Sequence, residues 1–195
     1  MARLTLPTDE ATIRSLRVGD FVELSGRVIT GRDAAHHWLV QSFRQEVAPY
    51  LKDSAIYHVG PVVRKNPDGT YGFVAAGPTT SAREEPYQAT VIGMYGLRGV
   101  IGKGGMGRKT LEGLKKFGAV YFHAVGGAAQ VLAERVRRVE TVFMLEQFGV
   151  PEALWVIEVE DFPVVVTMDA HGGSLHEEVE RHSQQRLQEL LGAAG

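Results

Sequence analysis

The sequence contains no cysteine among its 195 residues. Disulfides, thiol nucleophiles and the cysteine ligands of zinc and iron–sulfur centres all require that residue, so each is excluded within this chain. The 7 histidines show no H-E-x-x-H spacing, and we therefore expect no metal site built from this chain alone. Iron–sulfur chemistry, if the protein takes part in it, requires cluster ligands from another polypeptide.

Long hydrophobic runs and an excess of charge of one sign are also missing. The apolar run at 163–168 is far shorter than the roughly 20 residues that span a bilayer, and the first residues contain no apolar core of a signal peptide. With 21 basic and 23 acidic residues the formal net charge is −2, without the basic excess typical of nucleic-acid-binding proteins. We expect a cytoplasmic protein that binds neither membranes nor nucleic acid.

The residues that are present are those of an ordinary globular protein, with 44% hydrophobic side chains, and the length predicts one domain over 1–195. Alternation and short apolar runs predict strands at 21–29, 55–63, 71–76, 99–102, 119–125, 139–144, 154–159 and 164–168. Periodicity and capping residues predict helices at 33–44, 82–95, 108–117, 126–135 and 174–192. The order indicates a mixed α/β domain in which a hairpin, 55–63 with 71–76, interrupts the alternation.

Capping-box spacing accompanies three of the predicted helix starts, at Thr30 with Asp33, at Ser81 with Glu84, and at Ser174 with Glu177. The last helix carries one apolar face, which we expect to pack against the domain or against a partner. That face consists of Leu175, Val179, Leu187 and Leu191.

Three strand-to-helix junctions each combine small residues with one cation: T-G-R-D at 30–33, G-P-T-T-S-A-R at 77–83 and G-K-G-G-M-G at 102–107. A helix N-terminus attracts anions, glycine lets the backbone approach closely, and arginine matches a carboxylate with a planar fork. If adjacent strands bring the junctions to one sheet edge, they form a pocket for a small di- or tricarboxylate or a phosphate. Caps and turns alone would also explain each junction taken singly.

The third junction also matches G-x-G-x-x-G between a strand and a helix, which leaves a nucleotide- or phosphate-binding module built on Gly102–Gly107 as an alternative. The acidic residue expected about 20 residues later in a dinucleotide site is missing. A P-loop is excluded because Gly104 follows Lys103 where serine or threonine is needed.

Four motifs in this order resemble the β subunit of the two-subunit iron–sulfur hydro-lyases, which are the class I fumarases and the L(+)-tartrate dehydratases. The same unit forms the C-terminal domain of single-chain class I fumarases. The motifs are T-G-R-D-A-A-H at 30–36, G-P-V-V-R-K at 60–65, and the junctions at 77–83 and 102–107, with further agreement at 152–155, 158–163 and 169–172. The resemblance covers about residues 18–175, and the C-terminal helix follows at about 174–191.

The resemblance implies a swivelling β/β/α-type single domain, with a mixed sheet and flanking helices. It implies a partner α subunit that carries a cysteine-ligated [4Fe–4S] cluster, in an α2β2 heterotetramer, and the absence of cysteine here agrees with that division. The implied reaction is the reversible hydration of fumarate to malate, with L(+)-tartrate dehydration as the alternative. A purely structural subunit whose site residues have drifted is a third possibility.

Matched by motif position, Arg32, Arg83 and Lys103 correspond to family residues that bind the substrate carboxylates, and Thr79 to the threonine put forward as the catalytic base. Removing a proton beside a carboxylate builds negative charge, which preplaced cations stabilise. A threonine hydroxyl is a poor base unless neighbouring cations lower its pKa. The residues that we expect to support this set are His36, Thr80, Gly102 and Gly104.

One residue departs from the family pattern. Family members usually carry methionine after the arginine of the Pro-Thr-Thr motif, whereas this chain has Glu84. Successive helix side chains point about 100° apart and the first helical turn favours acids, so we expect Glu84 to be a cap rather than a pocket residue. The substrate remains open between fumarate, tartrate and a methylated relative.

Overall fold

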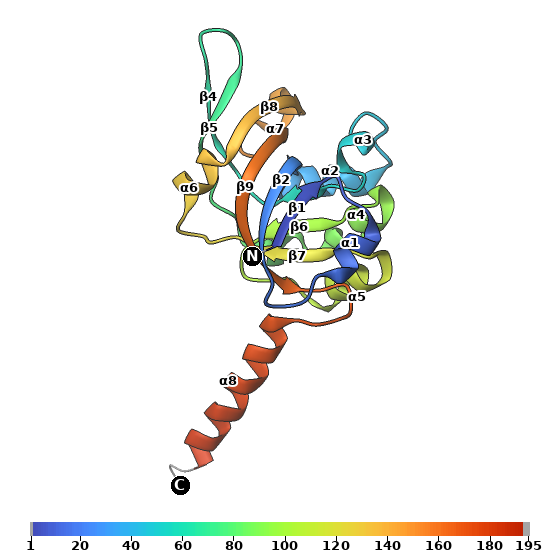
Figure 1. Ribbon diagram of the computed structural model, residues 1–195, viewed down its shortest axis with the longest axis vertical. Helices are drawn as coiled ribbons and strands as arrows, with labels where there is room; N and C mark the ends of the chain where they lie inside the picture. Colours follow the sequence, from blue (N-terminus) through green and yellow to red (C-terminus); the bar gives the residue numbers. More distant parts are fainter. Residues whose placement is uncertain (1, 193–195) are drawn as a thin grey trace.

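The computed structural model describes residues 2–192, and its centre is a closed five-stranded barrel (Figure 1). Four of the five strands are parallel neighbours, in the order β2 (Phe21–Thr30), β3 (Ala55–Tyr57), β6 (Gly99–Gly102) and β7 (Val120–His123). The long strand β9 (Leu154–Met168) is antiparallel to both β7 and β2 and thereby closes the barrel. The predicted mixed α/β class is confirmed.

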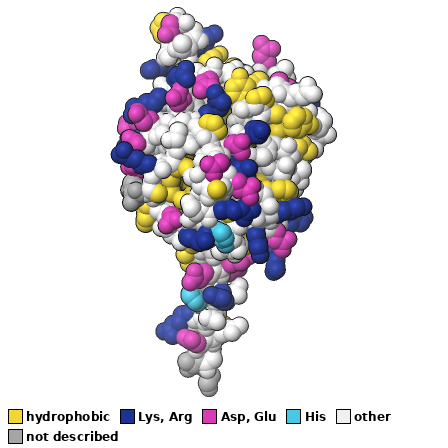
Figure 2. Space-filling view, turned by 45° about the vertical axis from the view of Figure 1, so that its right-hand side comes forward, with side chains coloured by type: hydrophobic (Ala, Val, Ile, Leu, Met, Phe, Trp, Pro, Cys, Tyr) yellow, Lys and Arg dark blue, Asp and Glu magenta, His cyan; other side chains and the backbone are white. Residues whose placement is uncertain are grey.

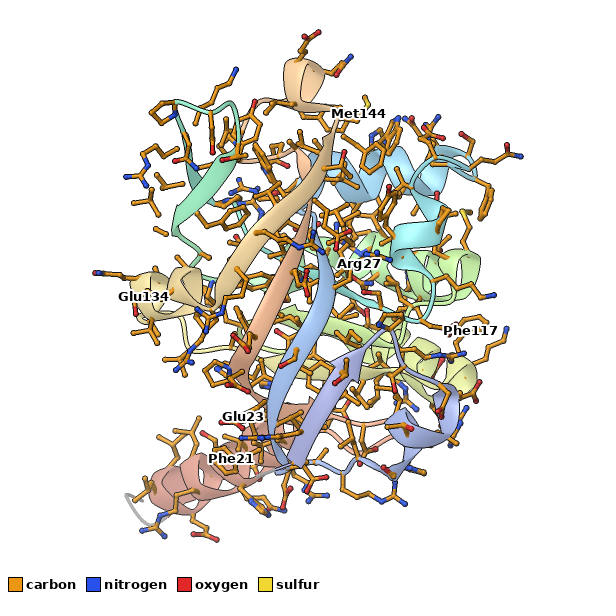
Figure 3. The ribbon with its side chains drawn as sticks, turned by 45° about the horizontal axis from the view of Figure 1, so that its top comes forward. Phe21, Glu23, Arg27, Phe117, Glu134 and Met144 are labelled. Atoms are coloured by element: carbon orange, nitrogen blue, oxygen red, sulfur yellow. The ribbon has the colours of Figure 1, made fainter. Side chains whose placement is uncertain are left out.

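Two further pairings extend the barrel. β1 (Ala2–Leu6) lies parallel to β2, and β8 (Val136–Phe143) lies antiparallel to β9. In Figure 3, β2 passes from Phe21 and Glu23 to Arg27, and β8 runs beside β9 from Glu134 towards Met144. A separate hairpin joins β4 (Val62–Lys65) to β5 (Tyr71–Ala75) and projects from the body. A hairpin therefore interrupts the alternation as predicted, but its first strand is Val62–Lys65 and not 55–63.

The helices are α1 (Glu10–Ser15), α2 (Asp33–Gln41), α3 (Ala48–Leu51), α4 (Glu85–Tyr95), α5 (Arg108–Phe117), α6 (Ala129–Glu134), α7 (Leu145–Phe148) and α8 (Leu175–Gly192), with a 3-10 turn η1 (Ser81–Glu84). The hydrophobic core consists of two clusters separated by the sheet of the barrel. One lies inside the barrel, and the other lies between the barrel and the helices α2 to α5. β3 shows why both form, since Ala55 and Tyr57 belong to the first cluster and Ile56 to the second.

Several predicted boundaries are wrong. The strand expected at 55–63 is two strands, β3 and β4, and the two expected at 154–159 and 164–168 are halves of β9. The helix expected at 82–95 begins as the turn η1, and the helix expected at 33–44 ends at Gln41. The sequence pattern predicts none of the short elements β1, α1, α3 and α7. β6 and α5 have the predicted bounds.

Two of the three predicted capping boxes are also wrong. Thr30 is the last residue of β2, where its hydroxyl donates to the Ala153 carbonyl oxygen (3.2 Å) and accepts from the backbone N–H of Trp155 (2.9 Å). Ser81 makes no cap hydrogen bond. At α8 the cap is confirmed, because the backbone N–H of Glu177 donates to the Ser174 hydroxyl (3.3 Å).

The helix α8 projects away from the barrel (Figure 1) and none of its residues is buried. Val179, Leu187 and Leu191 are 58%, 56% and 67% exposed, so the expectation that this face packs against the domain is wrong. The other expectation, that a partner covers it, stays a prediction. Within residues 2–192, every helix falls short of the length and apolar character that crossing a membrane requires. On the face drawn in Figure 2, acidic and basic side chains are interspersed.

Candidate functional site

The three junctions with cations meet at one end of the barrel. β2, β3 and β6 are parallel neighbours, so the chain segments that follow them emerge at the same edge. Thr80 forms an isolated parallel bridge with Lys103, and the backbone N–H of Ser81 donates to the Lys103 carbonyl oxygen (3.1 Å). The loop at 77–83 is tied to the end of β3 because the backbone N–H of Thr79 donates to the His58 carbonyl oxygen (2.7 Å).

Two carboxylates hold the two arginines of this site in place. Arg83 pairs with Asp33 through Nε–Oδ1 (3.1 Å) and Nη2–Oδ2 (2.8 Å). Arg32 lies with its Nε 2.6 Å from Oε1 of Glu152 and 3.8 Å from Oδ2 of Asp33. The Arg83 side chain is 56% exposed and that of Arg32 is 26% exposed, so both side chains reach solvent while each is paired with a carboxylate. Nε of Arg32 meets Glu152 as an ion pair without hydrogen-bond geometry.

The loop that carries Lys103 depends on glycine. Gly104 and Gly105 have φ values of 81° and 75°, a region that side chains with a Cβ rarely adopt. Lys103 itself is half-buried, and its side chain runs beside Gly126, where a Cβ would lie 3.8 Å from Nζ. At Gly102 a Cβ would overlap the Ser81 hydroxyl, so this glycine is required for the loop at 77–83 to approach β6.

A chain of buried hydrogen bonds lies beneath the loops. The side-chain amide of Gln88 contacts Nε2 of His36 (2.9 Å) and Nε2 of His58 (2.8 Å). Nδ1 of His58 pairs with the Ser81 hydroxyl (2.9 Å), which also accepts from the Tyr121 hydroxyl (2.9 Å). Burial lowers the pKa of both histidines and raises that of Tyr121, so these groups are neutral at pH 7. The network gives the loops a rigid base.

Glu84 is not the exposed cap that the sequence predicts. Its side chain is fully buried, its Oε2 lies 3.8 Å from Nδ1 of His36, and neither carboxyl oxygen has a hydrogen-bond partner within residues 2–192. Burial and, next, the charge of Asp33 raise the pKa of Glu84 to about 7, against the opposing effect of Arg83. The expectation fails because residues 81–84 form a 3-10 turn, in which side chains take directions different from those of an α-helix.

The neighbouring acid, Glu85, makes the capping contacts, and it does so for a different helix. Its Oε2 accepts from the backbone N–H of Gly107 (2.8 Å) and from the Thr110 hydroxyl (2.7 Å). Its Oε1 accepts from the backbone N–H of Thr110 (3.2 Å). A carboxylate of the chain itself therefore satisfies the N-terminus of α5, the helix that follows the glycine-rich loop.

The structure places each predicted site residue at or beneath this end of the barrel. Arg32, Arg83, Lys103 and Thr79 belong to the three junctions, Thr80 is exposed beside them, and His36 is buried below. Six residues complete the arrangement although the sequence predicts no role for them in the site, namely Asp33, His58, Ser81, Gln88, Tyr121 and Glu152. Asp33, Ser81 and Glu152 lie in the quoted motifs, which was the available signal. The other three come together only through the tertiary structure.

Comparison with known proteins gives matches along nearly the whole chain. Residues 2–179 match the model of the family described as Fumarase C-terminus. The chain is 50% identical over 187 residues to "Putative fumarate hydratase class I" of Geobacillus stearothermophilus, a match that covers 96% of this chain and 36% of that protein. The chain thus spans about a third of this relative.

Two relatives of similar length are β subunits by name. "Putative L(+)-tartrate dehydratase subunit beta" of Methanocaldococcus jannaschii is 40% identical over 183 residues, covering 92% of this chain and 93% of that protein. "L(+)-tartrate dehydratase subunit beta" of Escherichia coli K12 is 41% identical over 174 residues, covering 88% and 85%.

Proposed function

The chain belongs to the Fumarase C-terminus family, and from this premise we propose that it is the β subunit of a hydro-lyase that reversibly hydrates fumarate to malate. The observation that carries the proposal is the meeting of Arg32, Arg83 and Lys103 at one end of the barrel, in loops tied together by backbone hydrogen bonds. L(+)-tartrate dehydration is the alternative, because relatives with either name match at similar identity. The swivelling β/β/α arrangement belongs to the same proposal, supported by the closed barrel with helices packed outside it.

The proposal includes a partner. The sequence has no cysteine, and within residues 2–192 no group of three or more histidine, aspartate or glutamate side chains is arranged to hold a metal ion. The residues of this chain therefore do not fit a [4Fe–4S] cluster. We assign the cluster to a cysteine-bearing α subunit, in an α2β2 assembly, and the names of two relatives as β subunits support this assignment.

In this reaction the chain's contribution is to bind and orient a dicarboxylate. Removing the proton beside a carboxylate transfers negative charge onto that group, and a guanidinium fixed beforehand stabilises the charge without reorganising. Asp33 and Glu152 position the two arginines, because Asp33 forms an ion pair with Arg83 and Glu152 forms one with Arg32. Thr79 is the proposed base. Its backbone is anchored to the end of β3, and the cations of the same loops would lower the pKa of its hydroxyl.

The alternative of a nucleotide-binding module has less support. A phosphate bound by the loop 102–107 would use the free N–H groups at the start of α5. Glu85 already accepts from two of those N–H groups, at Gly107 and Thr110, and its negative charge would repel a phosphate. The geometry therefore favours a small carboxylate beside Lys103 over a phosphate at this helix end.

Substitution in the assembled enzyme tests the proposal. Arg83→Ala or Lys103→Ala should each reduce kcat/KM by about 30-fold to several thousandfold, equivalent to about 2–5 kcal/mol, because each removes one partner of a substrate carboxylate. Arg108→Ala is the matched control, since Arg108 is an exposed arginine whose one ion pair within residues 2–192 is with Glu112 of the same helix. Turnover that survives both substitutions would show that the site is elsewhere.

A further inference from the structure

Glu84 is a buried carboxyl group without a hydrogen bond within residues 2–192, and it lies near enough to Arg32 and Arg83 for their charges to act on it. An ionised carboxylate in that position would lack both water and hydrogen-bond donors, which is a costly arrangement. A protonated carboxyl avoids that cost.

The hydrogen bonds of His36, which lies beside Glu84, determine which of its ring nitrogens carry protons. Nδ1 of His36 lies 3.0 Å from the Arg32 carbonyl oxygen, which can only accept, so Nδ1 carries a proton. With the oxygen of Gln88 facing Nε2, the imidazole must be doubly protonated, and its positive charge would favour an ionised Glu84. With the Gln88 amide turned by 180°, its two N–H bonds serve both histidines and His36 is neutral, which removes that charge from beside Glu84 and favours the protonated carboxyl group.

Burial favours the second arrangement, because it disfavours the charged form of both residues. His58, the other buried imidazole, is neutral in both. His36 is therefore neutral, with its one ring proton on Nδ1, and the carboxyl group of Glu84 is protonated below about pH 7.

The proton on Glu84 decides the net charge around the substrate carboxylates. Asp33 and Glu152 already balance the two guanidinium charges of Arg32 and Arg83. With Glu84 neutral, Asp33, Glu152 and the two arginines together carry no net charge, and Lys103 gives the site one positive charge. With Glu84 ionised, Arg32, Arg83 and the three carboxylates together carry one negative charge, which cancels that of Lys103. A dicarboxylate would then meet a site without positive charge.

We propose that Glu84 is a positioning residue that must hold a proton for the site to accept a dicarboxylate, so that substrate and one proton bind together. The inference rests on the proposed function, which supplies the roles of Arg32 and Arg83. It adds a coupling between substrate affinity and pH that a methionine at this position would not provide. By linkage, the apparent dissociation constant rises up to tenfold for each pH unit above the point at which Glu84 loses its proton.

The test uses the assembled enzyme, with fumarate as substrate and succinate as a dicarboxylate that cannot be hydrated. KM for fumarate and the inhibition constant of succinate are measured from pH 6 to pH 9. In the native enzyme both should rise up to tenfold per unit above about pH 7. In Glu84→Gln both should stay near their low-pH values, and the effect should reside in KM rather than in kcat. Glu178→Gln, at an exposed position on α8, should behave as native.

A second measurement does not depend on any variant. Calorimetric titration of the native enzyme with succinate, in two buffers of different ionisation enthalpy, should show uptake of close to one proton per site at pH 8. Absence of proton uptake at pH 8, or a Glu84→Gln enzyme whose KM retains the native pH dependence, would overturn the inference while leaving the proposed function intact. An assembled enzyme that hydrates neither fumarate nor the tartrate alternative would overturn both.

Discussion

The buried carboxyl group of Glu84 predicts an unusual dependence of stability on pH. Its pKa is about 7 in the folded chain against 4.5 for the ordinary group, so the folded state binds the proton more tightly than the unfolded state. The stabilisation is fully present below pH 4.5 and is lost as pH rises through 7. A difference of 2.5 pKa units at about 1.4 kcal/mol each amounts to about 3 kcal/mol. The Glu84→Gln variant should lack this loss.

The assay is urea denaturation of the full chain at pH 5, 6, 7 and 8, comparing the free energy of unfolding of native and Glu84→Gln protein. Between pH 5 and 8 the native protein should lose about 2–3 kcal/mol more than the variant. His36 affects stability in the opposite direction, because its lowered pKa reduces the free energy of unfolding as the pH falls below 6.5. Comparing native and variant protein at the same pH removes this effect. If the free energy of unfolding changed with pH in the same way in native and variant protein, Glu84 would not bind its proton more tightly in the folded chain.

Three further substitutions test the geometry of the site. Gly60→Ala would place a Cβ on Nη1 of Arg32, which is the end of a flexible side chain. We therefore expect a free energy of unfolding within about 1 kcal/mol of the native value but a kcat/KM at least about tenfold lower. Native activity in this variant would contradict the expectation. Gly102→Ala would overlap the buried Ser81 hydroxyl and should destabilise the fold by about 1–3 kcal/mol in urea, and an unchanged midpoint would show that the loops are not tightly packed. Glu85→Ala should cost about 1 kcal/mol through the lost cap of α5, measured in the same way, whereas an unchanged stability would mean that the cap contributes nothing.

Features encoded by neighbouring residues could be predicted from the sequence. β6 and α5 have the predicted bounds because a short apolar strand, a glycine loop and an amphipathic helix are each local patterns. The junctions with Arg32, Arg83 and Lys103 were found for the same reason, since glycine and a cation beside a helix start can be recognised within a few residues.

Features that depend on distant residues could not be predicted. Ser81 has the spacing of a cap, but His58 and Tyr121 offer it partners from other strands, and these contacts replace the cap. The direction of Glu84 depends on whether one turn is 3-10 or α-helical, which local propensity does not decide. The face of α8 has helical periodicity whether or not this chain covers it, so the pattern could not distinguish the domain from a partner.

We propose that this chain supplies the dicarboxylate-binding half of an iron–sulfur hydro-lyase. The most direct test is to purify the chain with its bound partners from the native host without oxygen and to assay the complex for hydration of fumarate, with L(+)-tartrate in parallel. We predict a cysteine-bearing iron–sulfur partner and turnover of fumarate, whereas turnover of tartrate alone would keep the class and change the substrate. A chain that purifies without an iron–sulfur partner and binds a dinucleotide saturably by itself would contradict the account.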